Sequence, residues 1–161
     1  MSARSRMDVR FLRWPHAADL APPAYQSAGA AGLDLVAAID DPINLAPGSR
    51  VLVSSGFSVE LPSTLEAQVR PRSGLALKHG VTVLNAPGTI DSDYRGEIKV
   101  LLINHGSESL HIERGDRIAQ LVIAPVVRAE VTLVDKLADS DRGGAGFGST
   151  GTKGRSAAET R

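Results

Sequence analysis

Five side chains that can carry acid–base chemistry or bind charged groups stand close together in the middle of this chain. They are Asp91, Asp93, Tyr94, Arg95 and Glu97, all within seven residues. A turn between two strands needs only one or two polar residues, so this density indicates a preorganised pocket wall. Carboxylates in such a wall can orient and deprotonate a water molecule.

A second candidate site lies in the segment Pro71–Ala76, with the sequence PRSGLA. Ser73 is a good N-cap residue for a short helix over Gly74–His79, and its hydroxyl would then only satisfy the first helical turn. The free N–H groups of that turn, its dipole and the forked side chain of Arg72 could alternatively bind a phosphate together. The residues alone leave both interpretations open.

Three further polar residues stand in or beside predicted strands. A strand over Arg117–Leu121 would place Gln120 on the same face as Ile118, which is an odd place for an amide unless it meets a polar ligand or another chain. Asp34 follows a glycine and has a plain interpretation as a turn acid. Lys99 has an equally plain one, as a cation that faces solvent.

The end of the chain is rich in glycine. Six of the twelve residues from Gly143 to Gly154 are glycine, so backbone entropy predicts that this segment is mobile by itself. Phe147 is its one large apolar side chain. We therefore expect an arm that is ordered by a ligand and not by its own packing.

Five segments together resemble, in order, the five signature motifs of the trimeric dUTP pyrophosphatases (dUTPases), which hydrolyse dUTP to dUMP and pyrophosphate. These segments are Ala31–Leu35, Pro71–Leu75, Asn85 with Gly88–Glu97, Arg117–Leu121 and Arg142–Gly151. The resemblance extends over most of the chain. It departs from the family at Ala145, where glycine is usual, and a closed arm would be strained there if the position needs a positive φ.

The resemblance implies that water attacks the α-phosphorus of dUTP with the help of Mg²⁺. Asp91 would orient and deprotonate that water. Asn85 and the neighbouring hairpin backbone would read the uracil edge, and the Tyr94 ring would lie under the deoxyribose and exclude a 2′-hydroxyl. The substrate-binding residues implied in this region are Asn85, Gly88, Thr89, Ile90, Asp91, Tyr94 and, near the substrate, Lys99.

The resemblance also implies where the triphosphate and the metal ion are held. Asp34 would act through water on Mg²⁺, since a hard cation chelated by phosphates keeps several waters. In the arm, Phe147 would stack on uracil while other residues reach the outer phosphates. The remaining substrate-binding residues implied are Arg72, Ser73, Gly74, Gln120, Arg142, Gly148, Ser149 and Thr150.

These groups need an all-β scaffold to position them. Short stretches of alternating apolar residues separated by frequent turns, with one helix at Gly74–His79, are typical of an antiparallel barrel or jelly roll. We predict a turn region at Asp40–Gly48, and a break at Asn85–Gly88 where Gly88 permits a positive φ. Strands are predicted at Met7–Trp14, after Gly32, and at Arg50–Ser54, Phe57–Leu61, Leu65–Val69, Val81–Leu84, Ile98–Asn104, Arg117–Leu121 and Val126–Leu133.

The dispersion of the motifs predicts an assembly. No single small barrel easily brings together groups from Asp34 to Phe147, and the family's sites draw on all three chains of a homotrimer. The apolar strand Val100–Ile103 should be buried on both faces or lie in a subunit contact. The expected organisation is a jelly-roll-like β-barrel domain over residues 1–139 and a flexible C-terminal arm over residues 140–161.

Composition limits the partners. The formal net charge is zero, so no global field favours nucleic acid or a membrane, and any phosphate binding must be local. The chain has no cysteine, which excludes disulfides and thiolate metal sites and suits a reducing cytoplasm. Its longest apolar run, Leu121–Val127, is too short to span a bilayer. We expect a cytoplasmic enzyme whose partners are dUTP and copies of itself.

Two other functions remain open at this stage. Deamination of dCTP occurs on the same fold, but the intact PRSGL segment and the arm with Phe147 argue against it. A non-catalytic, nucleotide-responsive regulator is the other, and the presence of Asp91 does not indicate such a loss of catalysis. The products formed from dUTP, dCTP and dTTP with Mg²⁺ would distinguish all three.

Overall fold

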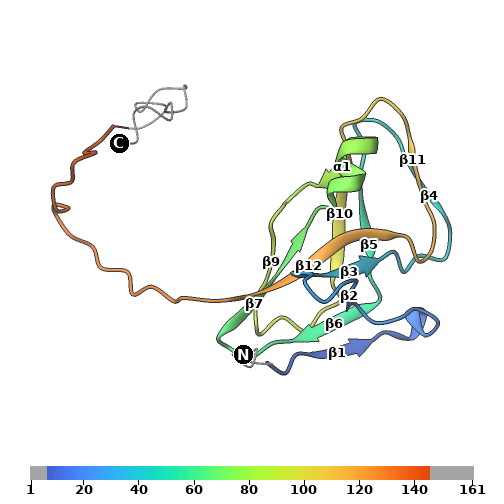
Figure 1. Ribbon diagram of the computed structural model, residues 1–161, viewed down its shortest axis with the longest axis horizontal. Coiled ribbons are helices and arrows are strands. Elements are labelled where there is room, and N and C mark those ends of the chain that lie inside the picture. The colour runs from blue at the N-terminus through green and yellow to red at the C-terminus, as the bar shows by residue number, and fades with distance from the viewer. Residues whose placement is uncertain (1–6, 146–161) are drawn as a thin grey trace. The chain divides into compact units, whose positions relative to one another are not determined.

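Figure 1 shows a computed structural model of the chain, which describes residues 7–145. The chain divides into two compact units, one that extends to Val127 and one that begins at Arg128. The expected substrate residues Phe147, Gly148, Ser149 and Thr150 lie outside the described residues.

The first unit consists of β-strands with one short α-helix, as the sequence predicts. Neither helical segment within residues 7–145 has the length and apolar character that a membrane span requires. The elements are β1 (Arg10–Arg13), the 3₁₀ turn η1 (Pro15–Ala17), β2 (Ala24–Tyr25), β3 (Gly32–Val36), β4 (Ile43–Leu45), β5 (Arg50–Ser54), β6 (Phe57–Glu60), β7 (Leu65–Arg70), α1 (Ser73–His79), β8 (Val81–Val83), β9 (Gly88–Ile90), β10 (Lys99–Asn104), β11 (Leu110–Ile112) and β12 (Arg117–Pro125).

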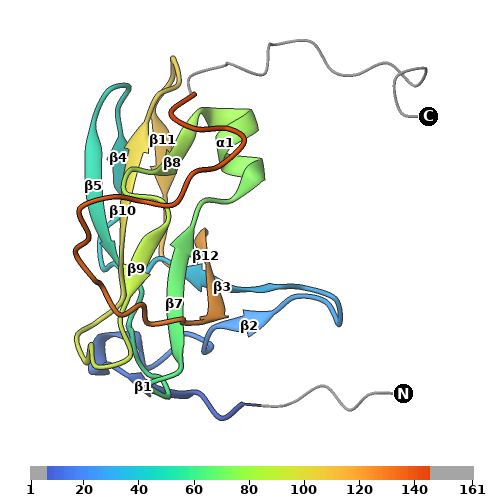
Figure 2. The ribbon, with the colours of Figure 1, turned by 90° about the vertical axis from the view of Figure 1, so that its left-hand side faces the viewer.

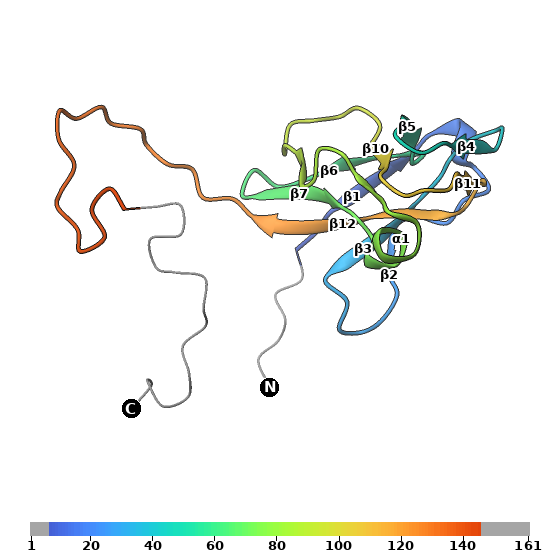
Figure 3. The same cartoon turned by 90° about the horizontal axis from the view of Figure 1, so that it is seen from above.

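The strands form four antiparallel sheets. The largest has the order β2-β3-β12-β7-β9, so that β12 and β9 lie on either side of β7 (Figure 2). Figure 3 shows β7 beside β12 from above. The others are β5-β10-β8, β1-β6 and β11-β4. Residues 7–145 form no closed barrel, and the structure therefore supports the all-β prediction without the barrel.

One apolar core joins these sheets. In β7, Leu65, Ala67 and Val69 are buried, whereas the alternate residues are half-buried or exposed, as the period of a strand requires. In β10, Val100 and Leu102 enter the same core, while Leu101 and Ile103 on the other face are only partly covered. The sequence predicts that this second face is also buried or lies in a subunit contact.

A β-bulge in β12 overturns the predicted placement of Gln120. The pairing of β12 with β3 shifts in register between Arg117 and Ala119. Both Ile118 and Ala119 belong to the core, and Gln120 lies opposite Asp34 outside it. Gln120 therefore does not share a face with Ile118. A bulge inserts one residue into the alternation, and no simple alternating pattern reveals it.

The helix boundary also differs from the prediction. Arg72 is the N-cap residue of α1, with extended backbone (φ −91°, ψ 126°), and Ser73 is the first helical residue. The helix ends at Gly80, whose left-handed φ of 66° terminates it. Ser73 is thus not the N-cap, and its hydroxyl makes no hydrogen bond within residues 7–145.

Four short strands were not predicted, and one predicted strand is absent. β2, β4, β9 and β11 have two or three residues each, too few to display alternation, and β4 lies within the predicted turn at Asp40–Gly48. The predicted strand Val126–Leu133 is wrong for the isolated chain, because residues 126–133 have no strand partner.

The second unit contains no helix or strand over residues 128–145. Val131 and Leu133 are 92% and 99% exposed. A turn follows, in which the guanidinium Nε of Arg142 donates a hydrogen bond to the carbonyl oxygen of Ala145 at 2.9 Å. The expected arm residue Arg142 is thus engaged with its own segment.

Asn104 at the end of β10 holds the loop between β10 and β11 against the end of β4. Its fully buried side-chain amide donates to the carbonyl oxygens of Leu45 and Glu108 at 2.9 and 2.8 Å. Its Oδ1 atom accepts a hydrogen bond from the backbone N–H of Gly106 at 2.8 Å. Each polar atom of this side chain is therefore satisfied by backbone.

We predict that Asn104→Ala lowers the free energy of unfolding by about 2–4 kcal/mol, because it leaves backbone groups without partners. Urea denaturation at a fixed protein concentration measures this change. Asn44→Ala, at the exposed position of β4, is the matched control and should change stability by less than about 0.5 kcal/mol. Equal losses for both variants would contradict a fastening role for Asn104.

Candidate active site

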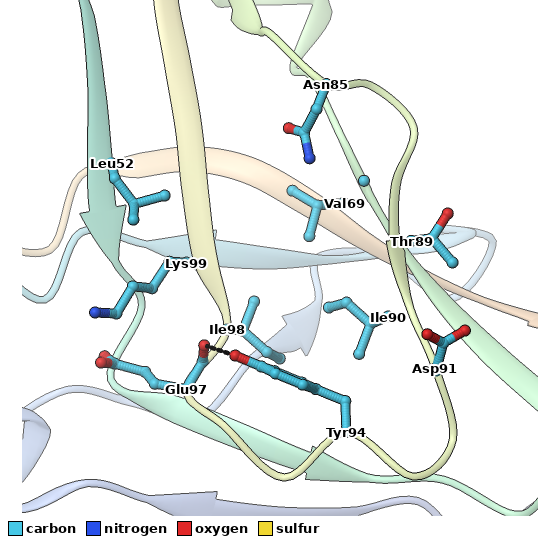
Figure 4. Close-up of a pocket in the computed structure, with 11 residues that line it drawn as sticks. Leu52, Val69, Asn85, Thr89, Ile90, Asp91, Tyr94, Glu97, Ile98 and Lys99 are labelled. Carbon is cyan, nitrogen blue, oxygen red and sulfur yellow. Dashed lines mark hydrogen bonds between the residues drawn. The ribbon is translucent and has the colours of Figure 1, made fainter.

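A hollow of about 280 Å³ opens where the loop after β8, strand β9 and the start of β10 meet (Figure 4). Asn85 and Tyr94 reach it from opposite sides, and Asp91 lies at its edge. The structure thus brings together the residues predicted around Asp91. The hollow is lined by Leu52, Val69, Asn85, Gly88, Thr89, Ile90, Asp91, Tyr94, Glu97, Ile98 and Lys99.

Strand β9 forms one wall and explains the glycine at its start. Gly88–Ile90 pairs with β7, with Gly88 opposite Val69. Gly88 does not adopt the positive φ that glycine permits. A Cβ atom at this position would lie 3.3 Å from both the Asn85 amide nitrogen and the Val69 Cβ atom. Glycine is therefore favoured here by close packing and not by backbone conformation.

The loop that follows β9 exposes the carboxylate of Asp91. The backbone N–H of Tyr94 donates to the Asp91 carbonyl oxygen at 3.1 Å, and Arg95 donates to the carbonyl oxygens of Ser92 and Tyr94 at 2.7 and 2.9 Å. Arg95 is thus used to hold the loop. Within residues 7–145 the Asp91 carboxylate has no hydrogen-bond or ion-pair partner, so it is free to bind a ligand or water.

The ring of Tyr94 is fixed at two points. Its hydroxyl donates a hydrogen bond to the carbonyl oxygen of Glu97 at 3.0 Å (Figure 4). The ring also covers Gly96 closely, because a Cβ atom on that residue would lie 2.6 Å from the Tyr94 Cζ atom. The aromatic face is therefore held in a defined place at one side of the hollow.

The Glu97 carboxylate anchors this loop to more distant segments. Its side chain is 11% exposed. It accepts hydrogen bonds from the backbone N–H of Gly56 at 2.8 Å, from His16 Nε2 at 3.0 Å and from the Ser54 hydroxyl at 3.3 Å. Glu97 is therefore a structural member of the acid cluster, and its carboxylate is already occupied.

Two residues of this region were not predicted from the sequence, Leu52 in the hollow and His16, which binds Glu97. His16 is 81 positions from Glu97, and Leu52 enters the hollow because β5 pairs with β10. No local pattern marks either residue, because the contacts of both join segments that are far apart in the sequence.

A second polar cluster surrounds the buried carboxylate of Asp34. Arg117 donates a hydrogen bond to its Oδ2 atom at 3.1 Å, and Gln120 to its Oδ1 atom at 3.4 Å. The Nε atom of Arg72 lies 3.9 Å from Oδ1. The predicted residues Asp34, Arg72 and Gln120 therefore lie together, but none of them lines the hollow that contains Asp91.

Ser73 and Gly74 follow Arg72 at the start of α1, and both are exposed. Arg72 also donates to the carbonyl oxygen of Arg117 at 2.9 Å, which ties the start of the helix to β12. The first helical turn therefore stands beside the Asp34 cluster with its N–H groups accessible. This arrangement can bind an anion.

The donor set around Asp34 does not form a cage for a metal ion. Residues 7–145 contain no group of three His, Asp or Glu side chains that could hold one. A single carboxylate can still accept hydrogen bonds from the water shell of a hard cation that other ligands chelate. The cluster therefore fits contact with a hydrated divalent ion through water.

Comparison with known proteins places these features in a family. A sequence model of the dUTPase family matches residues 18–151. The solved dUTPase of Staphylococcus bacteriophage 80alpha with dUpNHpp is 24% identical with a TM-score of 0.80, over 90% of this chain and 99% of that one. A mutant dUTPase from phage phi11 of S. aureus, described with a structural Mg(II) ion, is 19% identical with a TM-score of 0.72, over 81% and 98%.

We predict that Gly96→Ala displaces the Tyr94 ring, because the added methyl group would occupy the space of the phenol. Such overpacking should cost about 1–3 kcal/mol of stability. A crystal structure of the variant would show whether the hydroxyl leaves the Glu97 carbonyl oxygen. Gly29→Ala is the matched control, since no atom lies within 4 Å of its added methyl group. An unmoved ring in Gly96→Ala would refute this packing constraint.

Proposed function

The chain belongs to the dUTPase family, whose members hydrolyse dUTP to dUMP and pyrophosphate, and we propose that the hollow beside Asp91 is where this reaction takes place. The observation that supports this proposal most directly is the carboxylate of Asp91. It is unpaired within residues 7–145 and lies at the hollow with the Asn85 amide and the fixed Tyr94 ring. These are the three groups needed to activate water, read a base and cover a sugar.

The hollow suits a deoxyuridine. Asn85 offers both a donor and an acceptor to the uracil edge, and the neighbouring strand β9 closes one wall. A hydrogen-bonding pocket of this kind rejects a base that leaves its polar groups unpaired. The Tyr94 ring would lie beneath the sugar, and its two-point attachment leaves it little freedom to admit a 2′-hydroxyl.

Asp91 would act as the general base. A phosphoric anhydride is attacked in line by water, so the base must hold the water opposite the leaving group. In this proposal the Asp91 carboxylate accepts the water proton as the new oxygen–phosphorus bond forms at the α-phosphorus, and the bond to pyrophosphate breaks. The exposed, unpaired state of the carboxylate supports this role.

The triphosphate would be held by the Asp34 cluster. Arg72, with the N–H groups of Ser73 and Gly74, would bind phosphate oxygens, and Gln120 would support them. Mg²⁺ is the cofactor of this family, and it neutralises charge on the triphosphate when bound. Asp34 would accept hydrogen bonds from its waters, as the single buried carboxylate favours. Lys99 lines the hollow and would contribute positive charge near the substrate.

A homotrimer would unite the two groups of residues. The Asp34 cluster does not line the hollow of its own chain, so a neighbouring subunit would supply it. The exposed apolar side chains support such an assembly, with Leu52 56% exposed and Leu133 in the second unit 99% exposed. The jelly-roll-like barrel implied by the family remains a prediction for the assembled protein.

The arm would complete the site. Arg142, Gly148, Ser149 and Thr150 would reach the outer phosphates while Phe147 stacks on uracil. Arg142 would have to leave the carbonyl oxygen of Ala145 to do so. Closure would exclude water other than the attacking molecule from the anhydride.

We predict that Asp91→Asn lowers kcat by about 10²–10⁴-fold and leaves KM for dUTP nearly unchanged, because the amide keeps the size but not the basicity of the carboxylate. Release of dUMP and pyrophosphate in the presence of Mg²⁺ measures both constants. Asp93→Asn, two positions away and outside the hollow, is the matched control and should retain near-parental kinetics. A parental rate for Asp91→Asn would show that another group activates the water.

We predict that removing every residue after Asp139 reduces turnover severely without changing the melting temperature or the assembly. The physical reason is that a glycine-rich segment adds little apolar burial to the folded protein. Light scattering should return a trimer for both the full-length and the shortened chains. A shortened protein that dissociates would identify the arm as a strap between subunits, and one that stays fully active would exclude a catalytic role.

A further inference from the structure

Two residues that follow β1, Trp14 and His16, hold the loop that carries Tyr94. We call this pair the brace. Trp14 donates its indole N–H to the Ser58 hydroxyl at 2.9 Å, and that hydroxyl donates to the Gly96 carbonyl oxygen at 2.8 Å. His16 Nε2 lies 3.0 Å from the Glu97 carboxylate. Because an ionised carboxylate only accepts, this histidine nitrogen carries the hydrogen. Trp14 and His16 thus act on two consecutive residues of the loop.

Those two residues are the ones that position the aromatic ring. The Tyr94 ring covers Gly96, and its hydroxyl is bound to the carbonyl oxygen of Glu97. A shift of the Gly96–Glu97 backbone would therefore move the ring. A continuous set of contacts connects Trp14 and His16, which lie outside the hollow, to the face that the sugar would meet.

The brace is itself held rigidly. Arg114 donates a hydrogen bond to the His16 carbonyl oxygen at 2.6 Å and pairs with Asp19, whose pKa it lowers to about 2. Ala17 is fully buried against Gly56, where an added Cβ atom would overlap it. The Trp14 backbone N–H bonds the Gly56 carbonyl oxygen at 2.9 Å. Trp14 and His16 therefore connect the loop that carries Tyr94 to a segment that is itself held in place.

The loop that carries Tyr94 is also held by other hydrogen bonds. The brace therefore affects the position of this loop but is not essential for folding. Glu97 keeps the N–H of Gly56 and the Ser54 hydroxyl if His16 is removed. The backbone N–H of Ile98 bonds the Phe57 carbonyl oxygen at 2.8 Å. Loss of one brace contact should therefore loosen the ring and leave the fold intact.

We propose that Trp14 and His16 are positioning residues that determine how strongly the site selects deoxyribose over ribose. The proposal rests on the role of Tyr94 given above. A rigid ring rejects the 2′-hydroxyl by contact, whereas a ring that can yield admits it. Loosening the brace should therefore harm dUTP hydrolysis less than it relaxes the rejection of UTP.

The ratio of kcat/KM for dUTP to kcat/KM for UTP tests this role. A change in stability or in the active fraction alters both constants equally and leaves the ratio unchanged. His16→Ala removes one contact, and Trp14→Phe removes the indole N–H but keeps an aromatic ring. Each should lower the ratio by roughly two- to tenfold, the effect of losing one hydrogen bond.

Two further variants complete the design. His16→Gln keeps an N–H donor of similar reach and should restore most of the parental ratio. His111→Ala removes a comparable histidine–glutamate pair, His111 with Glu113 at 3.5 Å, from a residue outside the hollow. It should leave the ratio unchanged, because His111 contacts neither the hollow nor the loop that carries Tyr94.

The outcomes separate this proposal from the proposed function. If the parental protein fails to hydrolyse dUTP, or hydrolyses UTP equally well, the function assigned to the hollow and to Tyr94 is wrong. If the parental protein selects dUTP and both His16→Ala and Trp14→Phe keep the parental ratio, only the brace is refuted. A ratio that falls in both variants and returns in His16→Gln would establish it.

Discussion

The hydrogen bonds accepted by the Glu97 carboxylate are the constraint on which the site depends. They join η1, the end of β5 with the turn that follows it, and the loop before β10 at one partly buried point. Since the backbone carbonyl oxygen of Glu97 accepts a hydrogen bond from the Tyr94 hydroxyl, this carboxylate also helps to fix the Tyr94 wall of the hollow. Asp91 stays unpaired among the described residues, and the nearby guanidinium of Arg95 is bound to backbone carbonyl oxygens of the same loop. Glu97 is thus a structural acid, whereas Asp91 remains available for the catalytic role proposed above.

The five-stranded sheet relates the two halves of the proposed site. Val69 of β7 lines the hollow, whereas the next residue, Arg70, lies opposite Gln120 of β12. Gln120 in turn lies opposite Asp34 of β3. Strand β7 thus lines the nucleoside hollow with Val69 and, one residue later, pairs with the strand that carries Gln120 of the Asp34 cluster. This division supports the proposal that several chains contribute to one nucleotide site.

The sequence predicted what is contiguous and missed what depends on pairing. The residues around Asp91 were found because one loop and two short strands carry them. The bulge in β12 was missed because Arg117–Leu121 alternates without a visible interruption, and only the pairing with β3 reveals the shift. Gly88 was assigned to a turn because glycine suits both a positive φ and a close contact. His16 could not be found, since its partner is 81 positions away.

Subunit complementation tests most directly whether one dUTP site draws on two chains. Asp91→Asn and Arg72→Ala chains, each with little activity alone, would be mixed in equal amounts, unfolded and refolded together. If Asp91 and Arg72 of one site come from different subunits, about a quarter of the sites in random trimers carry both intact residues. We therefore predict recovery of about a quarter of the parental activity. A refolded mixture no more active than the separate variants would contradict a site shared between chains.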